Sequence, residues 1–421
     1  MSTLSVAVIG EGAVGAATAF TLAREGHRVT LIEPGEPGGE QAASYGNACW
    51  ISPESVVPMA GPGVWRKVPG WLADPLGPLT IRWRHLPTLA PWLMRFLAAG
   101  SSAAKVARTA QALRALLHDA VERHEALATA AGVGELIVRR GHLYAFRDRS
   151  AFAAEAAAWR LRHEAGVRWI ELSAEELHQR EPALSNACRF AVLIEKAAHV
   201  SDPGAYVAAL AAAALSLGAE HRRTRARGFA LSAGRLTAVL TEDGSVAADR
   251  AVIAAGAHAK PLAAAVGDAV PLESERGYHI VIRSPEVSVR TPVMVAEAKV
   301  PLTPCAGGLR VAGQVELASL EAEPDWRRAE VLLALAQRML PGLPAELPRE
   351  RISRWFGHRP SIADGLPVIG PARGSPDVIH AFGHGHVGLA ASAKTALLVA
   401  DLVAGRAPLI DPSPYSASRF R

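Results

Sequence analysis

The sequence predicts an α/β protein in which a Rossmann-like domain with a parallel sheet is interleaved with a second domain built on a mostly antiparallel sheet with helices. Three observations support this fold class. A strand–helix–strand pattern with a glycine-rich turn opens the chain at residues 4–33, and a strand–turn–helix pattern returns at 378–404. Residues 268–316 between them contain several β-rich runs suited to an antiparallel sheet. A chain of 421 residues is also long for a single core.

The opening pattern has the spacing of a parallel crossover. Residues 4–9 predict a buried strand, 13–25 an alanine-rich helix and 28–33 a second strand. Two strands joined in this way through a helix form a right-handed βαβ unit.

The turn inside this unit carries the pattern GxGxxG. Gly10 permits the tight turn, Gly12 lets a pyrophosphate approach the backbone, and Gly15 lets helix and strand pack closely. The helix that begins with Ala13 and Val14 directs its positive N-terminus at the phosphates. The sequence therefore predicts a bound dinucleotide.

An acidic residue ends the second predicted strand. Glu33 lies where a carboxylate can accept hydrogen bonds from an adenosine ribose. Its charge would repel a ribose phosphate, which disfavours an NADP-type cofactor. This unit by itself leaves NAD and FAD both open.

Two later segments differ in character. Residues 50–97 are rich in Pro and Gly, which predicts an irregular cap, and contain five tryptophans: Trp50, Trp65, Trp71, Trp83 and Trp92. Residues 103–131 predict one long surface helix. The uncharged stretch 203–219 is short for a membrane span and follows the helix-starting pair Asp202–Pro203, so we expect a helix packed on the sheet.

Composition restricts the function classes. The net charge of +5 comes from widely scattered arginines, and the densest basic run, RRTRAR, has no interleaved aromatics, so no nucleic-acid partner is expected. Cys49, Cys188 and Cys305 have neither disulfide-framework nor metal-ligand spacing, and we expect no metal site. The N-terminus lacks a signal-peptide pattern, which favours a cytoplasmic location.

Several stretches, in the same order along nearly the whole chain, resemble the FAD-dependent D-amino acid oxidase and glycine oxidase superfamily, and within it the bacterial D-amino acid dehydrogenases of the small-subunit type. They are the N-terminal fingerprint, ASYGNACWISP (43–53), AVIAAGAHA (251–259), ERGYHI (275–280), GLRVAGQVE (308–316), HRPSIADGLPVIGP (358–371) and GHGHVGL (383–389). The resemblance implies FAD, and a Rossmann-like domain of the glutathione-reductase type.

We expect two domains that are interleaved along the chain. We place the FAD-binding domain in residues 1–50, 150–262 and 352–421. The substrate-binding or cap domain then takes 51–149 and 263–351.

The resemblance implies further FAD contacts. Ser44 and Asn47 would lie along the ribityl and pyrophosphate part, Ala226 would contact the adenine end, and Gly256 would close the dinucleotide sheet. His386, Val387, Gly388 and Leu389 would run past the flavin ring, where backbone NH groups stabilise negative charge. The alternative is that His384 and His386 merely cap the following helix. No cysteine corresponds to a covalent flavin attachment site, so FAD should be bound non-covalently.

Arg359 is the predicted anchor of the substrate carboxylate. The resemblance gives it this role, and a planar guanidinium can bind a carboxylate with two parallel hydrogen bonds. The alternative is a salt bridge to Asp364 or another acid. Tyr278 and His279 are candidates for a hydroxyl contact to the carboxylate or a wall over the flavin, with simple packing as the alternative. The aromatic found in glycine oxidases ahead of GLRVAG is missing here.

With FAD and an anchored carboxylate, the implied reaction is hydride transfer from the Cα of a D-amino or cyclic imino acid to flavin N5, without a dedicated base. The imino acid would hydrolyse to a 2-oxo acid and ammonia. Alternatives are a D-proline or D-hydroxyproline dehydrogenase, a glycine or sarcosine oxidase-type enzyme, and a non-catalytic FAD-binding subunit.

The electron acceptor and any macromolecular partner stay open. Dioxygen, a quinone or another carrier could take the electrons. The tryptophans of residues 50–97 suggest a contact with the inner face of the cell membrane or with a partner subunit. Their burial over the substrate pocket is the alternative.

Overall fold

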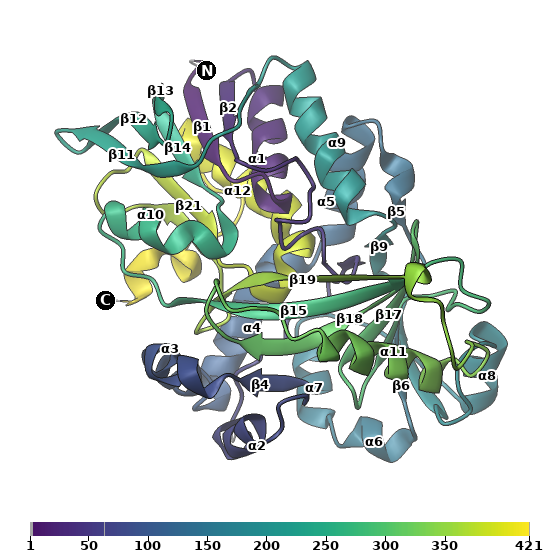
Figure 1. Ribbon diagram of the computed structural model, residues 1–421. Helices are drawn as coiled ribbons and strands as arrows, with labels where there is room; N and C mark the ends of the chain where they lie inside the picture. Colours follow the sequence, from purple (N-terminus) through teal and green to yellow (C-terminus); the bar gives the residue numbers. More distant parts are fainter. Residues whose placement is uncertain (1–2, 63, 421) are drawn as a thin grey trace.

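The structure is a computed structural model that describes residues 3–62 and 64–420. Figure 1 shows a layer of short strands with helices in its upper half, and a large sheet of long strands crossing below it. The chain passes between these two layers several times. Both predicted parts of the fold, the parallel sheet and the largely antiparallel one, are present.

The upper layer contains the predicted strand–helix–strand unit. Its strand order is β10, β2, β1, β14, β21 and β20, with all pairs parallel except β20–β21. The bounds are β1 (Ser5–Ile9), β2 (Arg28–Ile32), β10 (Glu220–Arg222), β14 (Arg250–Ile253), β20 (Val368–Pro371) and β21 (Val378–Phe382).

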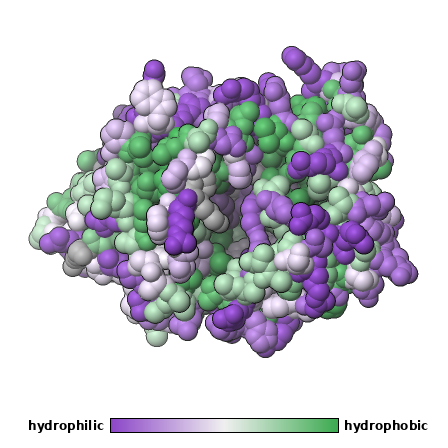
Figure 2. Space-filling view, turned by 90° about the horizontal axis from the view of Figure 1, so that it is seen from below, coloured by the Kyte–Doolittle hydropathy of each residue, from purple (hydrophilic) through white to green (hydrophobic). Residues whose placement is uncertain are grey.

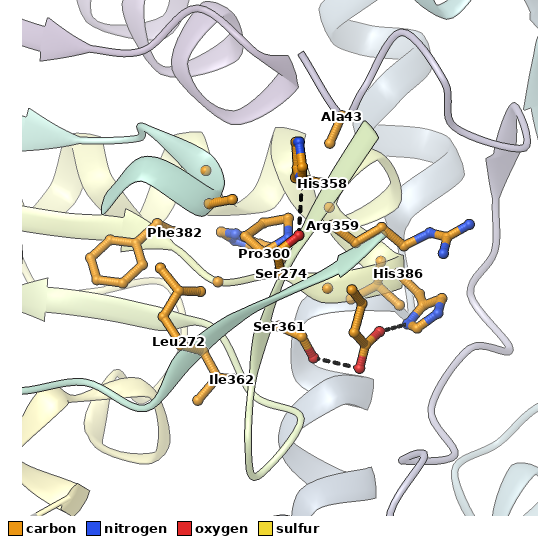
Figure 3. Close-up of a pocket in the computed structure, with 18 of the residues that line it drawn as sticks. Ala43, Leu272, Ser274, His358, Arg359, Pro360, Ser361, Ile362, Phe382 and His386 are labelled. Carbon is orange, nitrogen blue, oxygen red and sulfur yellow. Dashed lines mark hydrogen bonds and ion pairs between the residues drawn. The ribbon is translucent and has the colours of Figure 1, made fainter. Parts of the chain in front are cut away.

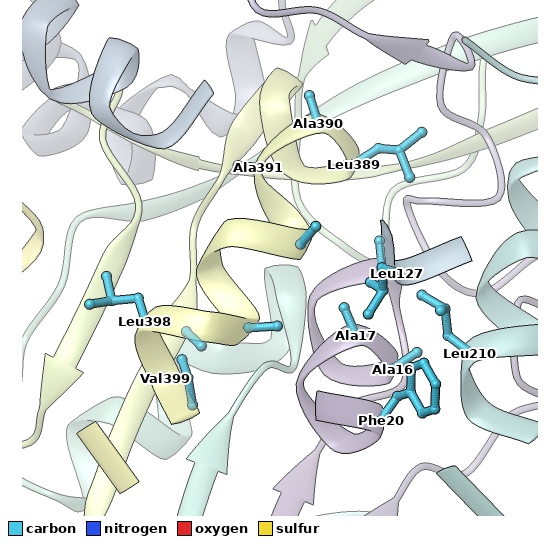
Figure 4. Packing of buried hydrophobic residues seen from close by; sticks show 14 of the residues in the cluster. Ala16, Ala17, Phe20, Leu127, Leu210, Leu389, Ala390, Ala391, Leu398 and Val399 are labelled. Atoms are coloured by element: carbon cyan, nitrogen blue, oxygen red, sulfur yellow. The ribbon is translucent and has the colours of Figure 1, made fainter. Parts of the chain in front are cut away.

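Helices α1 (Ala13–Arg24), α9 (Pro203–Ser216) and α12 (Gly388–Ala404) cover one face of this sheet. Alanines make the close packing possible, because Ala16 and Ala17 of α1 face Ala390 and Ala391 of α12 in one buried cluster (Figure 4). A large side chain such as Phe20 contributes about 1.5–3 kcal/mol by its burial there.

The two apolar helices of this layer are core helices. In α9 the Asp202 side chain caps the helix by accepting a hydrogen bond from the Ala205 amide at 3.0 Å, and Tyr206, Val207 and Leu210 are buried. This confirms the predicted packing of residues 203–219. Residues Gly385–Ala404 are long and apolar enough to span a membrane by length and composition, but 67% of that window is buried inside the protein.

The long helix predicted at 103–131 is wrong in one respect, because the chain bends in its middle. It forms α4 (Ala103–Leu117) and α5 (Ala120–Ala130), which both pack on α12. Asp119 at the bend forms an ion pair with Lys394 of α12, whose ammonium also donates to the Ala115 carbonyl at 2.9 Å. A contact between residues so far apart in sequence holds the bend.

The lower layer is the large, mostly antiparallel sheet. Its order is β19, β15, β18, β17, β16, β6, β8 and β7, and β4 (Leu79–Ile81) pairs with β18. The bounds are β6 (His142–Phe146), β7 (Ile170–Leu172), β8 (Phe190–Ile194), β15 (Leu272–Ile282), β16 (Val293–Val295), β17 (Val300–Cys305), β18 (Gly308–Leu317) and β19 (Ile352–Ile362). Helix α11 (Arg327–Met339) packs against β15 and β18.

The pairing of β15 with β19 decides which side chains can meet. The register is continuous from Leu272 opposite Ile362 to Ile282 opposite Ile352, with Glu275 directly opposite Arg359. Because side chains alternate along a strand, Glu275 and Arg359 share one face, and Tyr278 lies on the other.

A loop connects the two layers. Residues 35–49 leave β2 of the upper sheet, and side chains of the lower sheet hold their backbone carbonyls. The Trp355 indole donates to Glu40 O at 2.9 Å, His279 Nδ1 to Gly46 O at 3.3 Å, and Arg310 to Asn47 O at 2.7 Å.

The predicted domain boundaries disagree with the sheets at three places. Strands β7 and β8, expected in the FAD-binding segment 150–262, belong to the large sheet, as does β19, expected in 352–421. Helices α4 and α5, expected in the cap, pack on α12 of the upper layer. Each error arises because the chain changes layer without a change in composition.

The segment 50–97 is only partly irregular. It contains α2 (Val68–Ala73), β4 and the longer helix α3 (Leu86–Ala99), in which Trp92 and Phe96 are buried and stacked. Trp65 and Trp83 are 59% and 72% exposed. The side chain of Trp71 lies outside the described part of the structure.

Candidate active site

A cavity of ≈ 1380 Å³ lies between the two layers. The glycine-rich turn after β1 lines one end, and the ends of β15, β18 and β19 together with the turn before α12 line another part. Figure 3 shows Arg359 and His386 side by side in this part, and Ser274 and His358 hydrogen-bonded to each other at 2.8 Å.

Two of the three glycines of GxGxxG are sterically required, as predicted. Gly10 has φ +99, and a Cβ there would lie 2.5 Å from the carbonyl oxygen of Ala254. A Cβ on Gly15 would lie 1.9 Å from Gly10 O, so this residue sets the approach of helix to turn and does not line the cavity. Gly12, Ala13 and Val14 do line it.

The polar residues predicted around the turn also lie at the cavity. Ser44 Oγ accepts a hydrogen bond from Ala13 N at 3.3 Å, and the Glu33 carboxylate accepts from Gly35 N at 3.0 Å and Glu11 N at 3.2 Å. Asn47 lines the cavity, and its buried Oδ1 has no hydrogen-bond partner among the described residues. A ligand with hydrogen-bond donors would satisfy this oxygen.

The remaining predicted cofactor contacts lie along the same cavity. Ala226 and Gly256 line it, and so do His386, Val387, Gly388 and Leu389 at the start of α12. The cavity thus runs past a glycine turn, an acidic strand end and a helix N-terminus, which together fit an extended dinucleotide such as FAD. Among the residues that the structure describes, none that lines the cavity is a cysteine.

Arg359 is held with part of its guanidinium free. One nitrogen donates to the backbone carbonyl of Gln314 at 3.1 Å, and the side chain lies against Gly277, where a Cβ would approach it to 2.2 Å. Burial lowers the pKa of Arg359 from its usual value, and Glu275 opposes this change. The alternative partner, Asp364, is bound instead to Arg419 at 2.7 Å, so the remaining donors of Arg359 can bind an anion in the cavity.

A buried carboxylate beside Arg359 was not predicted. Ser361 donates to Glu275 Oε1 at 2.8 Å, and His386 Nδ1 lies 3.6 Å from Glu275 Oε2 (Figure 3). Glu275 occurs in ERGYHI, but the sequence alone could not tell which face of that strand meets the cavity. Its side chain is only 3% exposed.

The structure does not bring Tyr278 or His279 into the cavity, so their predicted catalytic roles are wrong for this arrangement. The Tyr278 hydroxyl donates to Glu316 at 2.7 Å in the core beneath α11, and burial raises its pKa to about 12. His279 shares the face of Arg359 but is buried against Trp355, with ring centroids 5.1 Å apart. Burial lowers the pKa of His279 to about 3.

The two histidines of GHGHVGL do not cap α12. His384 is buried, and it forms a hydrogen bond at 3.0 Å with Oγ1 of Thr395, which lies further along α12. His386 is 40% exposed toward the cavity and faces Glu275. Burial lowers the pKa of His386, which favours its neutral form.

Comparison with known proteins agrees with this geometry. The model of the DAO family of FAD dependent oxidoreductases matches residues 5–402. The chain belongs to this family. Among its relatives, a D-amino-acid oxidase of Bradyrhizobium diazoefficiens is 55% identical over 99% of this chain and 98% of its own length. D-amino acid dehydrogenase 2 of Ralstonia nicotianae is 33% identical over 99% of this chain and 100% of its own.

Solved structures of other enzymes share the fold. Glycine oxidase from Geobacillus kaustophilus superposes with a TM-score of 0.75 at 24% identity, covering 100% of this chain and 99% of that one. L-proline dehydrogenase from P. horikoshii gives 0.72 at 18% identity, covering 100% and 98%. The interleaved two-layer architecture predicted from the sequence is therefore confirmed.

The glycine turn contains an unusual buried acid. Glu11, between Gly10 and Gly12, is 2% exposed and lies 3.2 Å from His221 Nε2. Burial, with a smaller contribution from the Glu33 charge, raises the pKa of Glu11 to about 7. The carboxyl group thus changes charge near neutral pH in the folded protein.

We expect Gly15→Ala to abolish stable FAD binding, because the new methyl group would clash with the carbonyl of Gly10 and push α1 away from the turn. The measurement is the flavin-to-protein ratio after acid precipitation. Gly228→Ala is the matched control, since a Cβ there meets no atom within 4 Å. A full flavin complement in the Gly15 variant would contradict this role.

We expect Glu11→Gln to stabilise the protein at high pH. Because burial raises the folded-state pKa of Glu11 from 4.5 to about 7, the wild type loses stability as the pH rises from about 4.5 to about 7, and loses no more above that. The variant should be more stable than the wild type by roughly 1–3 kcal/mol at pH 9, and the two should be equally stable at about pH 4, below the unfolded-state pKa.

Melting temperatures at the two pH values measure this effect. Glu220→Gln, which changes an exposed carboxylate on β10, serves as control. An equal difference between variant and wild type at both pH values would exclude titration of Glu11 as the cause.

Proposed function

We propose that the protein is an FAD-dependent enzyme that oxidises the Cα–N bond of D-amino acids. The product is an imino acid, which hydrolyses to a 2-oxo acid and ammonia. The observation that carries the proposal is a partly free guanidinium, Arg359, in the same cavity as a dinucleotide-binding glycine turn. The D configuration follows the names of the relatives that match the full chain, an oxidase at 55% identity and a dehydrogenase at 33%.

The chain's own residues bind and orient the substrate. Arg359 receives the carboxylate with the donors not used by Gln314 O, and its contact with Gly277 fixes the direction of the guanidinium. When bound, FAD supplies the two-electron acceptor for the hydride of Cα. We propose that FAD is held non-covalently, because no described residue lining the cavity offers a cysteine sulfur.

We propose dioxygen as the electron acceptor, on the strength of the relative named an oxidase. The dehydrogenase relatives make a membrane quinone the competing candidate. Rapid mixing of the anaerobically reduced protein with dioxygen or with a soluble quinone analogue compares the two directly.

The test of the function is anaerobic bleaching of the bound flavin. A panel of D-amino acids, D-proline, cis-4-hydroxy-D-proline, glycine and sarcosine should show fast loss of flavin absorbance with D-amino acids. Bleaching by glycine and sarcosine alone would favour a glycine oxidase-type enzyme. A flavin that no member of the panel bleaches would overturn the proposal in favour of a binding subunit.

We expect Arg359→Lys to raise the half-saturating concentration of every carboxylate substrate by about tenfold or more, because a lysine cannot form the two parallel hydrogen bonds of a guanidinium. The FAD content should stay unchanged. Steady-state kinetics with the best substrate of the panel measure the effect. Unchanged half-saturation would refute the anchoring role.

We further propose that the surface of Trp65 and Trp83 contacts a membrane that contains anionic lipid. Arg66 and Arg84 each lie over the neighbouring indole at 5.3 Å, and such pairs of aromatic and basic side chains suit the membrane interface. The nearby Met59 and Val64 line the cavity. The side of the molecule that carries α2 and α3 faces the viewer in Figure 2, where hydrophobic and hydrophilic side chains border a hollow.

Flotation with phosphatidylserine-containing vesicles tests this contact. The wild type should float, and a Trp65→Ser/Trp83→Ser double variant should stay at the bottom of the gradient. A double variant of two exposed leucines elsewhere, Leu217→Ser/Leu231→Ser, should float like the wild type. Absence of the wild type from the vesicle fraction would contradict the proposed membrane contact.

A further inference from the structure

The geometry points to Glu275 as the residue that receives the amino group of the substrate and accepts its proton. Together with Arg359 it would form a receptor for the zwitterion of an α-amino acid. This inference rests on the proposed function and adds to it, since neither a family resemblance nor the GxGxxG pattern assigns a role to Glu275.

The first argument is placement. Glu275 and Arg359 are directly opposite each other in the antiparallel pair β15–β19 and point to the same face. Opposite residues of such a pair have Cβ atoms about 4.5–5.5 Å apart. The two side chains therefore leave the same face of the sheet side by side, and both residues line the cavity.

The second argument is an unfilled hydrogen-bonding position. The Ser361 hydroxyl donates a hydrogen bond to Glu275 Oε1 at 2.8 Å, while the buried Oε2 has no hydrogen-bond partner among the described residues. His386 Nδ1 is 3.6 Å from Oε2, which is an ion-pair distance but too long for a hydrogen bond. A buried carboxylate oxygen without a donor is costly, and an ammonium supplies three donors.

The third argument is chemical. An amino acid reaches the site as an ammonium, yet only a neutral amine has the lone pair that helps hydride leave Cα. The proposed step departs from the expectation of a reaction without a dedicated base: one N–H bond of the ammonium breaks, an O–H bond forms at Glu275 Oε2, and the electron pair stays on nitrogen. No further reactant is needed, because the carboxylate is already in place.

The charged and titratable groups around Glu275 suit this role. Arg359 faces Glu275 from β19 and stays cationic. The carboxylate of the substrate balances this positive charge. His386 faces Glu275 from the turn before α12, and burial favours its neutral form. The backbone of His384 forms an isolated β-bridge with Ser361, and its side chain is hydrogen-bonded to Thr395. His384 therefore does not compete with the substrate for Glu275.

A simpler role must be distinguished, in which Glu275 only orients Arg359. The two roles differ in their effect on ligands with and without an amino group. 2-Aminoisobutyrate has a zwitterionic head but no Cα hydrogen, so it cannot be oxidised. Isobutyrate has the same carbon skeleton without the amine.

The experiment compares the binding of these two ligands to the flavin-loaded protein, followed by the change in flavin absorbance. Glu275→Gln should weaken 2-aminoisobutyrate about tenfold or more, the range expected for a lost hydrogen bond to a charged group, and change isobutyrate less than twofold. Glu275→Asp should restore part of the loss. Glu273→Gln is the matched control on the same strand, since that carboxylate is bound by Lys260 at 3.0 Å and His85 at 3.4 Å.

Equal weakening of both ligands would assign Glu275 to the orientation of Arg359, and no weakening of either would remove it from the site. Both results overturn the inference.

A second measurement follows the rate of anaerobic bleaching against pH with a D-amino acid. In Glu275→Gln the rate should keep rising until the free substrate loses its own proton, whereas the wild type should reach its maximum at lower pH. Identical profiles would overturn proton acceptance alone. A wild type that no D-amino acid bleaches would instead defeat the proposed function itself.

Discussion

The antiparallel pairing of β15 with β19 is the constraint on which the proposed chemistry depends. Its uninterrupted register places Glu275 opposite Arg359 and Gly277 opposite Gly357. Gly277, the next residue after Glu275 on this face of the sheet, has no side chain and leaves the space that the Arg359 guanidinium fills. A slip of one residue would turn Glu275 to the opposite face of the sheet and leave Arg359 without its neighbour.

This pairing matters because the other layer brings the cofactor site to it. The glycine turn after β1, the end of β14 and the turn before α12 all line the cavity that Arg359 enters. Their positions follow from the close packing of α1 on α12 through alanines. The lower sheet thus supplies the charges that hold a small zwitterion, and the upper layer supplies the glycines and helix ends that suit phosphates.

Local features of the site were readable from the sequence. Gly10, Gly12, Gly15 and Glu33 act within one strand–helix–strand unit, so spacing alone predicted their places. Arg359 was predicted from its motif, and the structure places it in the cavity as expected.

Features that depend on contacts between distant residues were not readable. In ERGYHI the alternation separates Glu275 from Tyr278, but only pairing with β19 reveals which of the two faces the cavity, and Tyr278 was the wrong choice. The bend between α4 and α5 depends on Lys394, far along the chain. Where the chain changed layers, composition did not change, so the domain limits were misplaced.

The loop at 35–49 has a mechanical consequence. This segment belongs to the upper layer and borders the cavity, and its backbone carbonyls accept hydrogen bonds from three side chains of the lower sheet, Trp355, His279 and Arg310. A hinge opening between the layers would break all of these bonds together. Opening the cavity on this side would therefore cost the hydrogen bonds of three different strands at once.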